Sequence, residues 1–328
     1  MQAFEYVSPA TKQDAVKLLA AAGAESAVLA GGTDLLSLMK DYVVAPKRVV
    51  NIKSIKELQG IRYDSRRGLK LGVLTTLDQL LADKKIKQEY SSLWQAAQGV
   101  RSPQIQNMGT LGGDLCQRPR CWYYRNGYGL LAMQNGKSMV LEGDNRYHAI
   151  LGNTGPAYFV NASSLAPALI ALGSRLKIFG PDGAREVDLQ DFYLIPTKQG
   201  EREYKLAAAE IVTDILVPPA SRRNNATYEV RQKEALDWPL AAAAVALQMD
   251  GSRVKTARVV LGHVAPIPWR APQAEKFLAG KTIREDVAER AGEAAVTGAR
   301  PLSGNKYKIR LARVAVKRAI LRATGTEV

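Results

Sequence analysis

The chain has 328 residues, of which 46% are hydrophobic and 23% are charged, a balance typical of a globular protein with two or three packed units. Its net charge is +15, and its two cysteines are too few for a disulfide framework, which favours a reducing compartment. The first residues form no secretory signal and no apolar run could span a membrane, so we expect a cytoplasmic protein, unless a partner carries it folded into the periplasm.

Residues 1–55 alternate between strand-like and helix-like segments, which predicts a small parallel sheet. Ser8 opens a predicted helix with apolar residues at helical spacing, and this helix ends at Gly23. A short strand at 27–30 leads into a glycine turn and a second, short helix. Another strand is predicted at 48–52.

The glycine turn has the form of an anion-binding loop. Its two glycines let the backbone approach a ligand closely, and free N–H groups of the turn point toward that ligand. Asp34 stands at the N-cap of the following helix, where its carboxylate is expected to accept hydrogen bonds from helix amides. The spacing is not the G-x-G-x-x-G fingerprint, so an ordinary strand–helix turn remains the simpler interpretation of this segment alone.

Residues 56–220 are predicted to mix strands and helices. The predicted strands lie at 69–73, 157–160, 175–178 and 210–217. The predicted helices begin at the capping residue Thr76, at Ser91 and at the capping residue Ser163, the last running to Leu172. An irregular insertion rich in Arg, Tyr, Gly and Asn separates Cys116 from Asn153.

A second glycine pair, at 112–113, follows Thr110 at the end of a polar segment. A hydroxyl residue, Thr33, also adjoins the first pair, at 31–32. Two glycine turns in one domain support a bound diphosphate better than one turn does. Two unrelated turns remain an alternative of equal weight.

The segment 218–225, rich in Pro, Ser, Arg and Asn, is the best candidate for a linker between domains. Beyond it, we expect a strand to begin near Tyr228 and a hairpin to turn at 250–252, between strands at 240–249 and 253–262. Three helices are predicted to follow, at 272–279, 284–298 and 305–324.

The last predicted helix carries seven cations and no acidic residue, namely Lys306, Lys308, Arg310, Arg313, Lys317, Arg318 and Arg322. Its apolar residues share one face, so these cations are expected to line the other face. A solvated surface explains such a face most simply, and an acidic protein partner is the next interpretation. Nucleic acid is the weakest, because no recognised binding motif accompanies the charge.

The order of these motifs resembles the FAD-binding medium subunit of molybdenum hydroxylases, the group of xanthine dehydrogenase, carbon monoxide dehydrogenase and aldehyde oxidoreductase. The resemblance covers the chain essentially from end to end and rests on residues 29–36, 106–114, 261–270 and 299–303. It implies an α+β fold, with a two-subdomain FAD-binding domain of the PCMH type followed by a C-terminal α+β domain like that of the CO dehydrogenase flavoprotein. The implied boundaries are 1–220 (subdomains about 1–55 and 56–220, insertion 116–153) and 225–328.

By this resemblance, the two glycine turns bracket the pyrophosphate of FAD through backbone N–H groups and the hydroxyls of Thr33 and Thr110. Val212 matches an apolar position beside the flavin, and 237–238 matches a pattern near the domain interface. No catalytic residue and no metal ligand is implied, because the flavin carries the chemistry. The implied cofactor-binding residues are Val28, Leu29, Ala30, Gly31, Gly32, Thr33, Asp34, Leu35, Thr110, Leu111, Gly112, Gly113, Asp114, Ser164 and Val212.

The chain departs from the wider family at three places. Many relatives have Ser-Asp where this chain has Ser163-Ser164, so a carboxylate contact to FAD is replaced or lost. Some relatives place a lysine near the flavin where this chain has Glu229, an anion that would disfavour reduced, anionic flavin. Some relatives hold a [4Fe–4S] cluster in the insertion, but Cys116 and Cys121 are the only cysteines here, so we expect two free thiols and no cluster.

The resemblance implies an FAD-carrying electron-transfer subunit of a multisubunit molybdenum hydroxylase, built as a dimer of heterotrimers. A large molybdopterin subunit would oxidise the substrate, and a small subunit with two [2Fe–2S] clusters would pass electrons to this chain. The final acceptor is left open among NAD⁺, a quinone and oxygen. Two alternatives remain: a stand-alone FAD-dependent oxidoreductase, and a basic protein that binds nucleic acid through its last helix.

Overall fold

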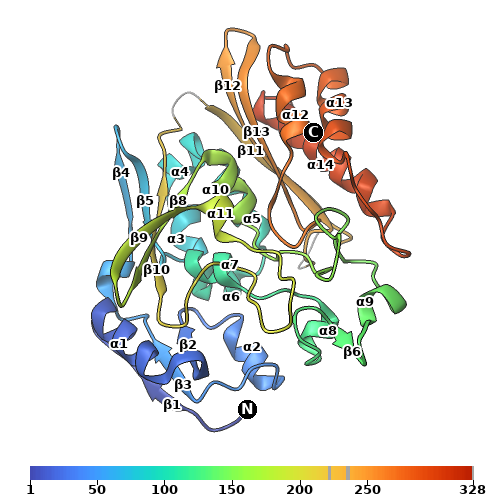
Figure 1. The fold of residues 1–328 in the computed structure, drawn as a ribbon. Helices are drawn as coiled ribbons and strands as arrows, with labels where there is room; N and C mark the ends of the chain where they lie inside the picture. Colours follow the sequence, from blue (N-terminus) through green and yellow to red (C-terminus); the bar gives the residue numbers. More distant parts are fainter. Residues whose placement is uncertain (221–222, 234–236, 327–328) are drawn as a thin grey trace.

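The computed structural model describes residues 1–220, 223–233 and 237–326, and its N-terminal unit is a three-stranded sheet (Figure 1, blue). The strand order β1-β3-β2 is parallel throughout, as the sequence predicts. Helix α1 begins after Thr11 rather than at Ser8, because the Thr11 side chain accepts a hydrogen bond from the Asp14 amide. The elements are β1 (Glu5–Val7), α1 (Lys12–Ala22), β2 (Ser26–Leu29), α2 (Leu35–Lys40) and β3 (Arg48–Asn51), with short 3₁₀ turns η1 (Gly23–Glu25) and η2 (Lys56–Leu58).

A five-stranded antiparallel sheet forms the centre of the molecule, in the order β4-β5-β10-β8-β9. Its strands are β4 (Ile61–Asp64), β5 (Gly68–Gly72), β8 (Arg175–Gly180), β9 (Gly183–Asp188) and β10 (Ile211–Val217). Helix α3 has a full capping box between Thr76 and Gln79, which explains where it begins. The helices of this unit are α3 (Leu77–Ala82), α4 (Lys84–Glu89), α5 (Ser91–Gly99), α6 (Pro103–Met108), α7 (Leu111–Cys116), α10 (Ala166–Leu172) and α11 (Leu189–Phe192).

The predicted strand at 157–160 is wrong, because these residues pair with no strand of the described chain. The segment is extended, but Ala157 and Phe159 are fully buried in a small cluster with Leu131 of the insertion. A short apolar run therefore reflects burial here without a sheet.

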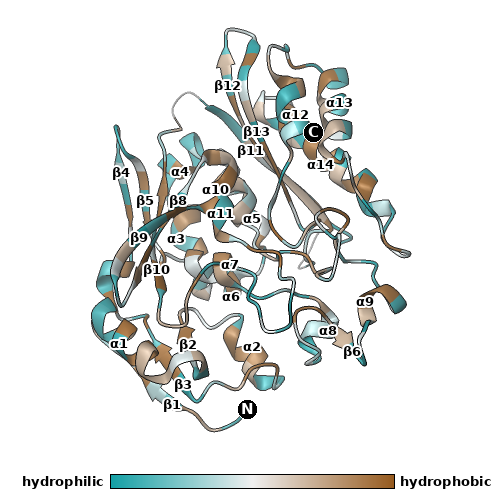
Figure 2. Ribbon diagram, in the orientation of Figure 1, coloured by the Kyte–Doolittle hydropathy of each residue, from teal (hydrophilic) through white to brown (hydrophobic). Residues whose placement is uncertain are grey.

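The C-terminal domain contains the sheet β11-β12-β13-β14, with α12, α13 and α14 on one face (Figure 1). Half of the residues of strand β12 are alanine, and the strand is covered on both faces. Ala243 and Val245 belong to the core beneath α14, whereas Ala244 and Ala246 belong to the core that includes α10. Helix α10 is buried along its whole length and lies between the two larger sheets. Figure 2 shows that this helix is hydrophobic. The elements are β11 (Arg223–Val230), β12 (Ala241–Asp250), β13 (Arg253–Gly262), β14 (Trp269–Arg270), α12 (Pro272–Leu278), α13 (Glu285–Ala295) and α14 (Tyr307–Ala323).

The hairpin and the three helices of this domain are confirmed close to their predicted bounds. Strand β11 begins at Arg223, inside the expected linker, and residues 221–222 of that segment lie outside the described residues. We therefore correct the start of this strand, which the sequence places near Tyr228.

Helix α14 does not present all of its cations to solvent. Lys308 is only 1% exposed, so its place on the solvated face is a correction to the sequence analysis. Lys317 pairs with Glu285 at 2.9 Å and with Glu289 at 3.3 Å, and Arg313 pairs with Glu293. These partners on α13 neutralise part of the basic face, which weakens its interpretation as a nucleic-acid surface.

The insertion lies beside the C-terminal domain and is fastened to it by side-chain hydrogen bonds (Figure 1, green). Asn145 donates to the Ser303 hydroxyl at 2.9 Å, and Asn305 donates to the carbonyl of His148 at 3.1 Å. Its elements are α8 (Trp122–Arg125), β6 (Met133–Gln134), β7 (Lys137–Ser138) and α9 (Met139–Glu142). Across the described residues, no helix combines the length and apolar character needed to cross a membrane.

Candidate functional site

The segments that carry the two glycine pairs meet in space, although 80 to 82 positions separate the pairs in the sequence. A Cβ atom built on Gly31 would lie 1.8 Å from the carbonyl oxygen of Met108 and 3.4 Å from the Cα of Gly109. The backbones touch at this point, so no side chain can be accommodated at Gly31. The structure thus brings together the two turns that the sequence singles out.

The first turn offers a row of unused backbone donors. Within the described residues, the N–H groups from Gly31 to Leu35 donate to no protein acceptor. The bonds of this segment begin only at Leu36, whose amide donates to the Gly32 carbonyl at 3.1 Å. Consecutive free amides in a glycine turn form a concave site for an anion.

The second turn differs, because its amides are already engaged. The amides of Leu111 and Gly112 donate to Thr75 and Val73 at 2.9 Å each, and that of Gly113 donates to the Thr110 hydroxyl at 3.1 Å. These bonds fix α7 against the end of β5. The expectation that backbone N–H groups of both turns hold a pyrophosphate is therefore corrected for residues 111–113, whose amides are engaged, and the first turn offers the longer row of free amides.

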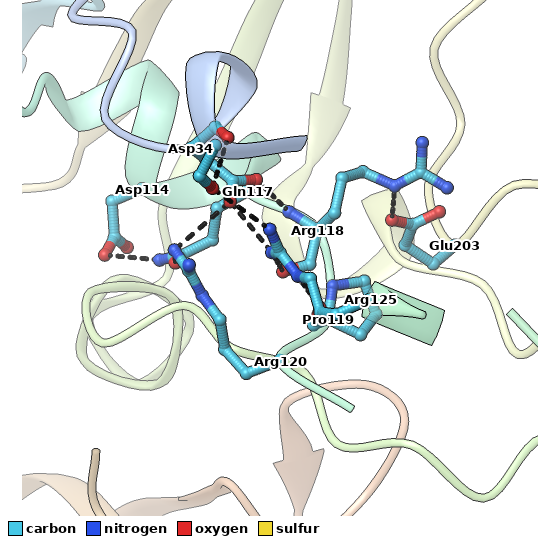
Figure 3. Close-up of polar contacts among 9 residues, drawn as sticks. Asp34, Asp114, Gln117, Arg118, Pro119, Arg120, Arg125 and Glu203 are labelled. Atoms are coloured by element: carbon cyan, nitrogen blue, oxygen red, sulfur yellow. Dashed lines mark hydrogen bonds and ion pairs between the residues drawn. The ribbon is translucent and has the colours of Figure 1, made fainter. Parts of the chain in front are cut away.

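Asp34 does not cap α2 with its side chain, contrary to the sequence-based expectation. Its carboxylate accepts hydrogen bonds from the backbone N–H of Arg118 and from the guanidinium of Arg125, each at 2.8 Å. Arg120 approaches the same carboxylate to 3.3 Å (Figure 3). The Asp34 carboxylate therefore bonds to residues of the insertion and not to the amides of the first turn, which stay available.

A chain of side chains connects the second turn to the insertion (Figure 3). Gln117 donates to Asp114 at 3.0 Å and accepts from Arg120 at 2.9 Å. The Arg120 guanidinium also lies 4.5 Å from the centre of the Trp238 ring. Arg120 is thus held between both turns and the C-terminal domain.

The side chain of Asp114, a residue of α7, lies against the start of α10, where the sequence has Ser163 and Ser164 and no acid. Its carboxylate accepts from the Ser163 hydroxyl at 2.5 Å and from the amides of Ser164 and Leu165 at 3.3 and 3.1 Å. Burial raises the pKa of Asp114, while these hydrogen bonds oppose that shift. The structure therefore places a carboxylate of α7 at the start of α10.

A cleft of about 260 Å³ opens between the first turn, α7 and the C-terminal domain. Six of the residues predicted to bind the cofactor line it: Thr33, Asp34, Thr110, Gly113, Asp114 and Ser164. Arg120, Arg231 and the backbone at Gly99 and Val100 also line it, and sequence analysis did not identify them. Trp238 and Asp237, noted only as lying near the interface, form part of the wall.

The other predicted residues are not among those that line this cleft. Leu29 belongs to the core of the N-terminal sheet, and Leu111 is fully buried beneath the second turn. Val212 is 6% exposed and pairs with Ile178 in the central sheet. The remaining ones are Val28, Ala30, Gly31, Gly32, Leu35 and Gly112, which build or adjoin the turns.

Glu229 faces a cation rather than standing as an isolated anion near the cleft. Arg231 contacts the Glu229 carboxylate at 2.5 Å and donates to the carbonyl of Gly99 at 2.5 Å. Arg231 lines the cleft, whereas Glu229 is not among its lining residues. The charge that reaches the cleft from this strand is therefore positive.

Both cysteines of the insertion are free thiols. Burial raises the pKa of Cys116 to about 12, and the Cys121 sulfur lies 3.2 Å from Nε2 of His148. Among the described residues, no group of three or more His, Cys, Asp or Glu side chains could hold a metal ion.

Two family models match the chain. Residues 2–220 match the FAD binding domain in molybdopterin dehydrogenase, and residues 226–323 match the CO dehydrogenase flavoprotein C-terminal domain. Together with the observed sheets and helices, these matches confirm the predicted two-part α+β fold.

Similar proteins include the aldehyde oxidoreductase FAD-binding subunit of Escherichia coli, which is 29% identical over 95% of this chain and 96% of that protein. The carbon monoxide dehydrogenase medium chain of Hydrogenophaga pseudoflava is 28% identical over 97% of this chain and 96% of that protein. Among solved structures, carbon monoxide dehydrogenase from Oligotropha carboxidovorans superposes with a TM-score of 0.77 at 25% identity, covering 99% of both chains.

Proposed function

We propose that this chain, which belongs to the family of FAD-binding domains of molybdopterin dehydrogenases, is the FAD-carrying electron-transfer subunit of a multisubunit molybdenum hydroxylase. The row of unpaired amides from Gly31 to Leu35, of which Thr33 and Asp34 line the cleft, carries this proposal. A dinucleotide places two adjacent phosphates in one spot, and such a row of N–H groups suits them.

The residues of the cleft fit the FAD pyrophosphate. The amides from Gly31 to Leu35 would bind phosphate oxygens, and the hydroxyls of Thr33 and Thr110 would add donors. Arg120 would supply a positive charge from the side of the insertion. The second turn would contribute little through its amides, but Gly113 leaves its surface free of a side chain.

Other residues would position the sugar and the ring of the cofactor. Asp114 and Ser164 stand together in the cleft wall and would accept or donate hydrogen bonds to hydroxyl groups of the ligand. Val100, which follows α5, and Arg231, which follows β11, also line the cleft and would face the flavin ring. Val28, Leu29, Leu111 and Val212 would act indirectly, by holding the two turns and the central sheet in place.

The bound flavin would supply reversible uptake of two electrons, and the chain would hold the flavin and control access to it. We propose that the electrons arrive from a small partner subunit with two [2Fe–2S] clusters and originate at a large molybdopterin subunit, in a dimer of heterotrimers. This proposal is supported by the relatives that match this chain over nearly their whole length, because they are named as medium chains or FAD-binding subunits.

Copurification tests this function. The chain isolated from its native source should be yellow, hold about one FAD per polypeptide, and come with an iron–sulfur subunit and a molybdenum subunit. Isolation as a single flavoprotein that oxidises an organic substrate by itself would instead support a stand-alone oxidoreductase. Isolation without any flavin would contradict the proposal.

A further inference from the structure

A second cavity, of about 260 Å³, adjoins the proposed flavin cleft where the insertion meets the C-terminal domain. The two spaces share the side chains of Arg120, Asp237, Trp238 and Pro239. A molecule in this second cavity, here named the chamber, would lie next to a ligand in the cleft. None of the roles derived above uses the chamber.

The chamber has aromatic and apolar walls. Trp122, Tyr147 and Trp238 line it together with Val160, Ala162 and Leu240. The rings of Trp122 and Tyr147 pack edge to face, with their centres 5.5 Å apart, so these walls hold one another in place. Such walls favour a flat aromatic guest over a charged or strongly hydrated one.

Two histidines add hydrogen-bonding groups to this lining. His148 and His263 are each 3% exposed, and burial followed by the nearby Lys308 lowers their pKa to about 4 and about 3. Both imidazoles are therefore neutral at pH 7. In the described part of the chain, Nδ1 of His148 and Nε2 of His263 have no hydrogen-bond partner. Both nitrogens have almost no exposed surface, so an imidazole would have to turn toward the chamber before it could donate to a ligand carbonyl.

Lys308 holds the backbone of both histidines and of Tyr147 in place. Its buried ammonium group donates to the carbonyls of Tyr147, His148 and His263 at 3.0, 3.2 and 2.7 Å. These bonds tie the insertion to the strand end that carries His263, whose φ of 61° is unusual for a residue other than glycine. Burial lowers the pKa of Lys308 to about 7, so near neutral pH only part of the molecules carry the positive charge beside the chamber.

We propose that the chamber binds a quinone and that this quinone accepts the electrons of the bound flavin. This inference rests on the proposed function and names the acceptor that it leaves open. A quinone has a flat apolar ring for the aromatic walls and two carbonyls for the histidines. The residues lining the chamber include no glycine turn for phosphates, which a nicotinamide dinucleotide would need.

The electron count closes without another reactant. A quinone takes up two electrons and two protons when its two carbonyls become hydroxyls. A flavin reduced by two electrons and carrying two protons supplies all four.

Binding to the oxidised, FAD-loaded chain tests the proposal, because no reaction can then occur. The probe is 2,3-dimethoxy-5-methyl-1,4-benzoquinone, followed by equilibrium dialysis and by quenching of tryptophan fluorescence. We expect saturable binding at one site, at least 10-fold weaker in Val160→Trp, which fills the chamber. Val187→Trp is the matched control, because Val187 is a half-buried valine of β9 remote from the chamber, and it should bind as the wild type does.

Tyr147→Ala gives an independent reading if Val160→Trp fails to fold, because Tyr147 is 37% exposed and removing its ring should weaken binding several-fold. Anaerobic reoxidation of the reduced flavin by the same quinone should show the same ranking of variants. The quinone proposal is overturned if Tyr147→Ala or Val160→Trp binds the quinone as tightly as the wild type does. It is also overturned if a chain that retains FAD shows no saturable binding, and in both cases the proposed function still stands. A chain that never retains FAD overturns the proposed function instead.

Discussion

Asp114 accepts a hydrogen bond from Ser163 at 2.5 Å, across 49 positions of the sequence, and so joins α7 to the start of α10. The same carboxylate accepts from the amides of Ser164 and Leu165. Replacing it by Asp114→Ala would leave these donors without their acceptor. A buried donor that loses its partner costs about 1–3 kcal/mol, so the free energy of unfolding should fall by about 2 kcal/mol.

Urea denaturation measures this loss, and a transplanted acid provides the control. Asp114→Ala combined with Ser164→Asp returns a carboxylate to the start of α10, the place where many relatives have one. The double variant should recover at least half of the lost stability and of the FAD retained after dialysis. If it behaves no better than the single variant, the two positions do not serve the same contact.

Gly31→Ala should remove FAD binding with little effect on the C-terminal domain. Its Cβ would lie 1.8 Å from the Met108 carbonyl oxygen, so one of the two touching backbones would have to move. That movement would displace the free amides of the first turn. We expect FAD affinity to fall at least 100-fold, which corresponds to about 2.7 kcal/mol, in a fluorescence titration with the cofactor.

Gly183→Ala is the matched control for this change. Gly183 has a backbone that disfavours other residues, with φ of 100°, but nothing lies within 4 Å of its Cβ position, whereas Gly31 has the close contact without a positive φ. The substitution should cost about 1 kcal/mol of stability through backbone strain and leave FAD affinity unchanged. Equal loss of FAD in both variants would show that strain in general, and not the contact at Met108, is responsible.

The elements of the fold follow local signals that the sequence carries. Helix α3 begins at Thr76 because of its capping box, and the hairpin β12–β13 turns at 251–252, as predicted from the glycine there. The apolar run at 157–160 predicts a strand, but a short apolar run is equally compatible with an irregular buried segment, and here it packs against residues of the insertion.

The chemistry of the site depends on contacts that no local signal reveals. Asp34 was taken for a helix cap, but its partner Arg118 lies 84 positions away in an insertion of no regular pattern. Lys308 was counted as a surface cation, because the sequence does not show that three carbonyls surround it. The glycine pairs could be recognised, whereas the unequal use of their amides depends on where Val73 and Thr75 lie.

Arg120→Ala should weaken FAD binding through loss of charge. The guanidinium lines the cleft, bonds Gln117 and lies near Asp34, and its removal takes away one cation of the cleft wall. We expect a 10-fold loss of affinity, about 1.4 kcal/mol, and a shallower dependence of the affinity on salt concentration. Arg185→Ala removes an arginine that pairs with Glu210 at the edge of the central sheet, and it should leave the affinity unchanged.

Stability should fall steeply in acid because of the two buried histidines. Their pKa values are about 4 for His148 and about 3 for His263 in the folded chain, below the ordinary value of 6.5. Between pH 6.5 and 4 the unfolded chain therefore binds protons that the folded chain does not, and the folded state loses free energy as the pH falls. Each pH unit costs about 1.4 kcal/mol per histidine in this range.

His263→Asn isolates one of these contributions. Asparagine tolerates the left-handed backbone at this position and does not titrate, so the variant should have a shallower fall of stability between pH 6 and 4 than the wild type. Unfolding by urea at a series of pH values measures the slope, and only a change in slope, as opposed to a uniform offset, reports the titration. The slope should decrease by about 1.4 kcal/mol per pH unit, and an unchanged slope would mean that His263 is protonated in the folded chain at mild acidity.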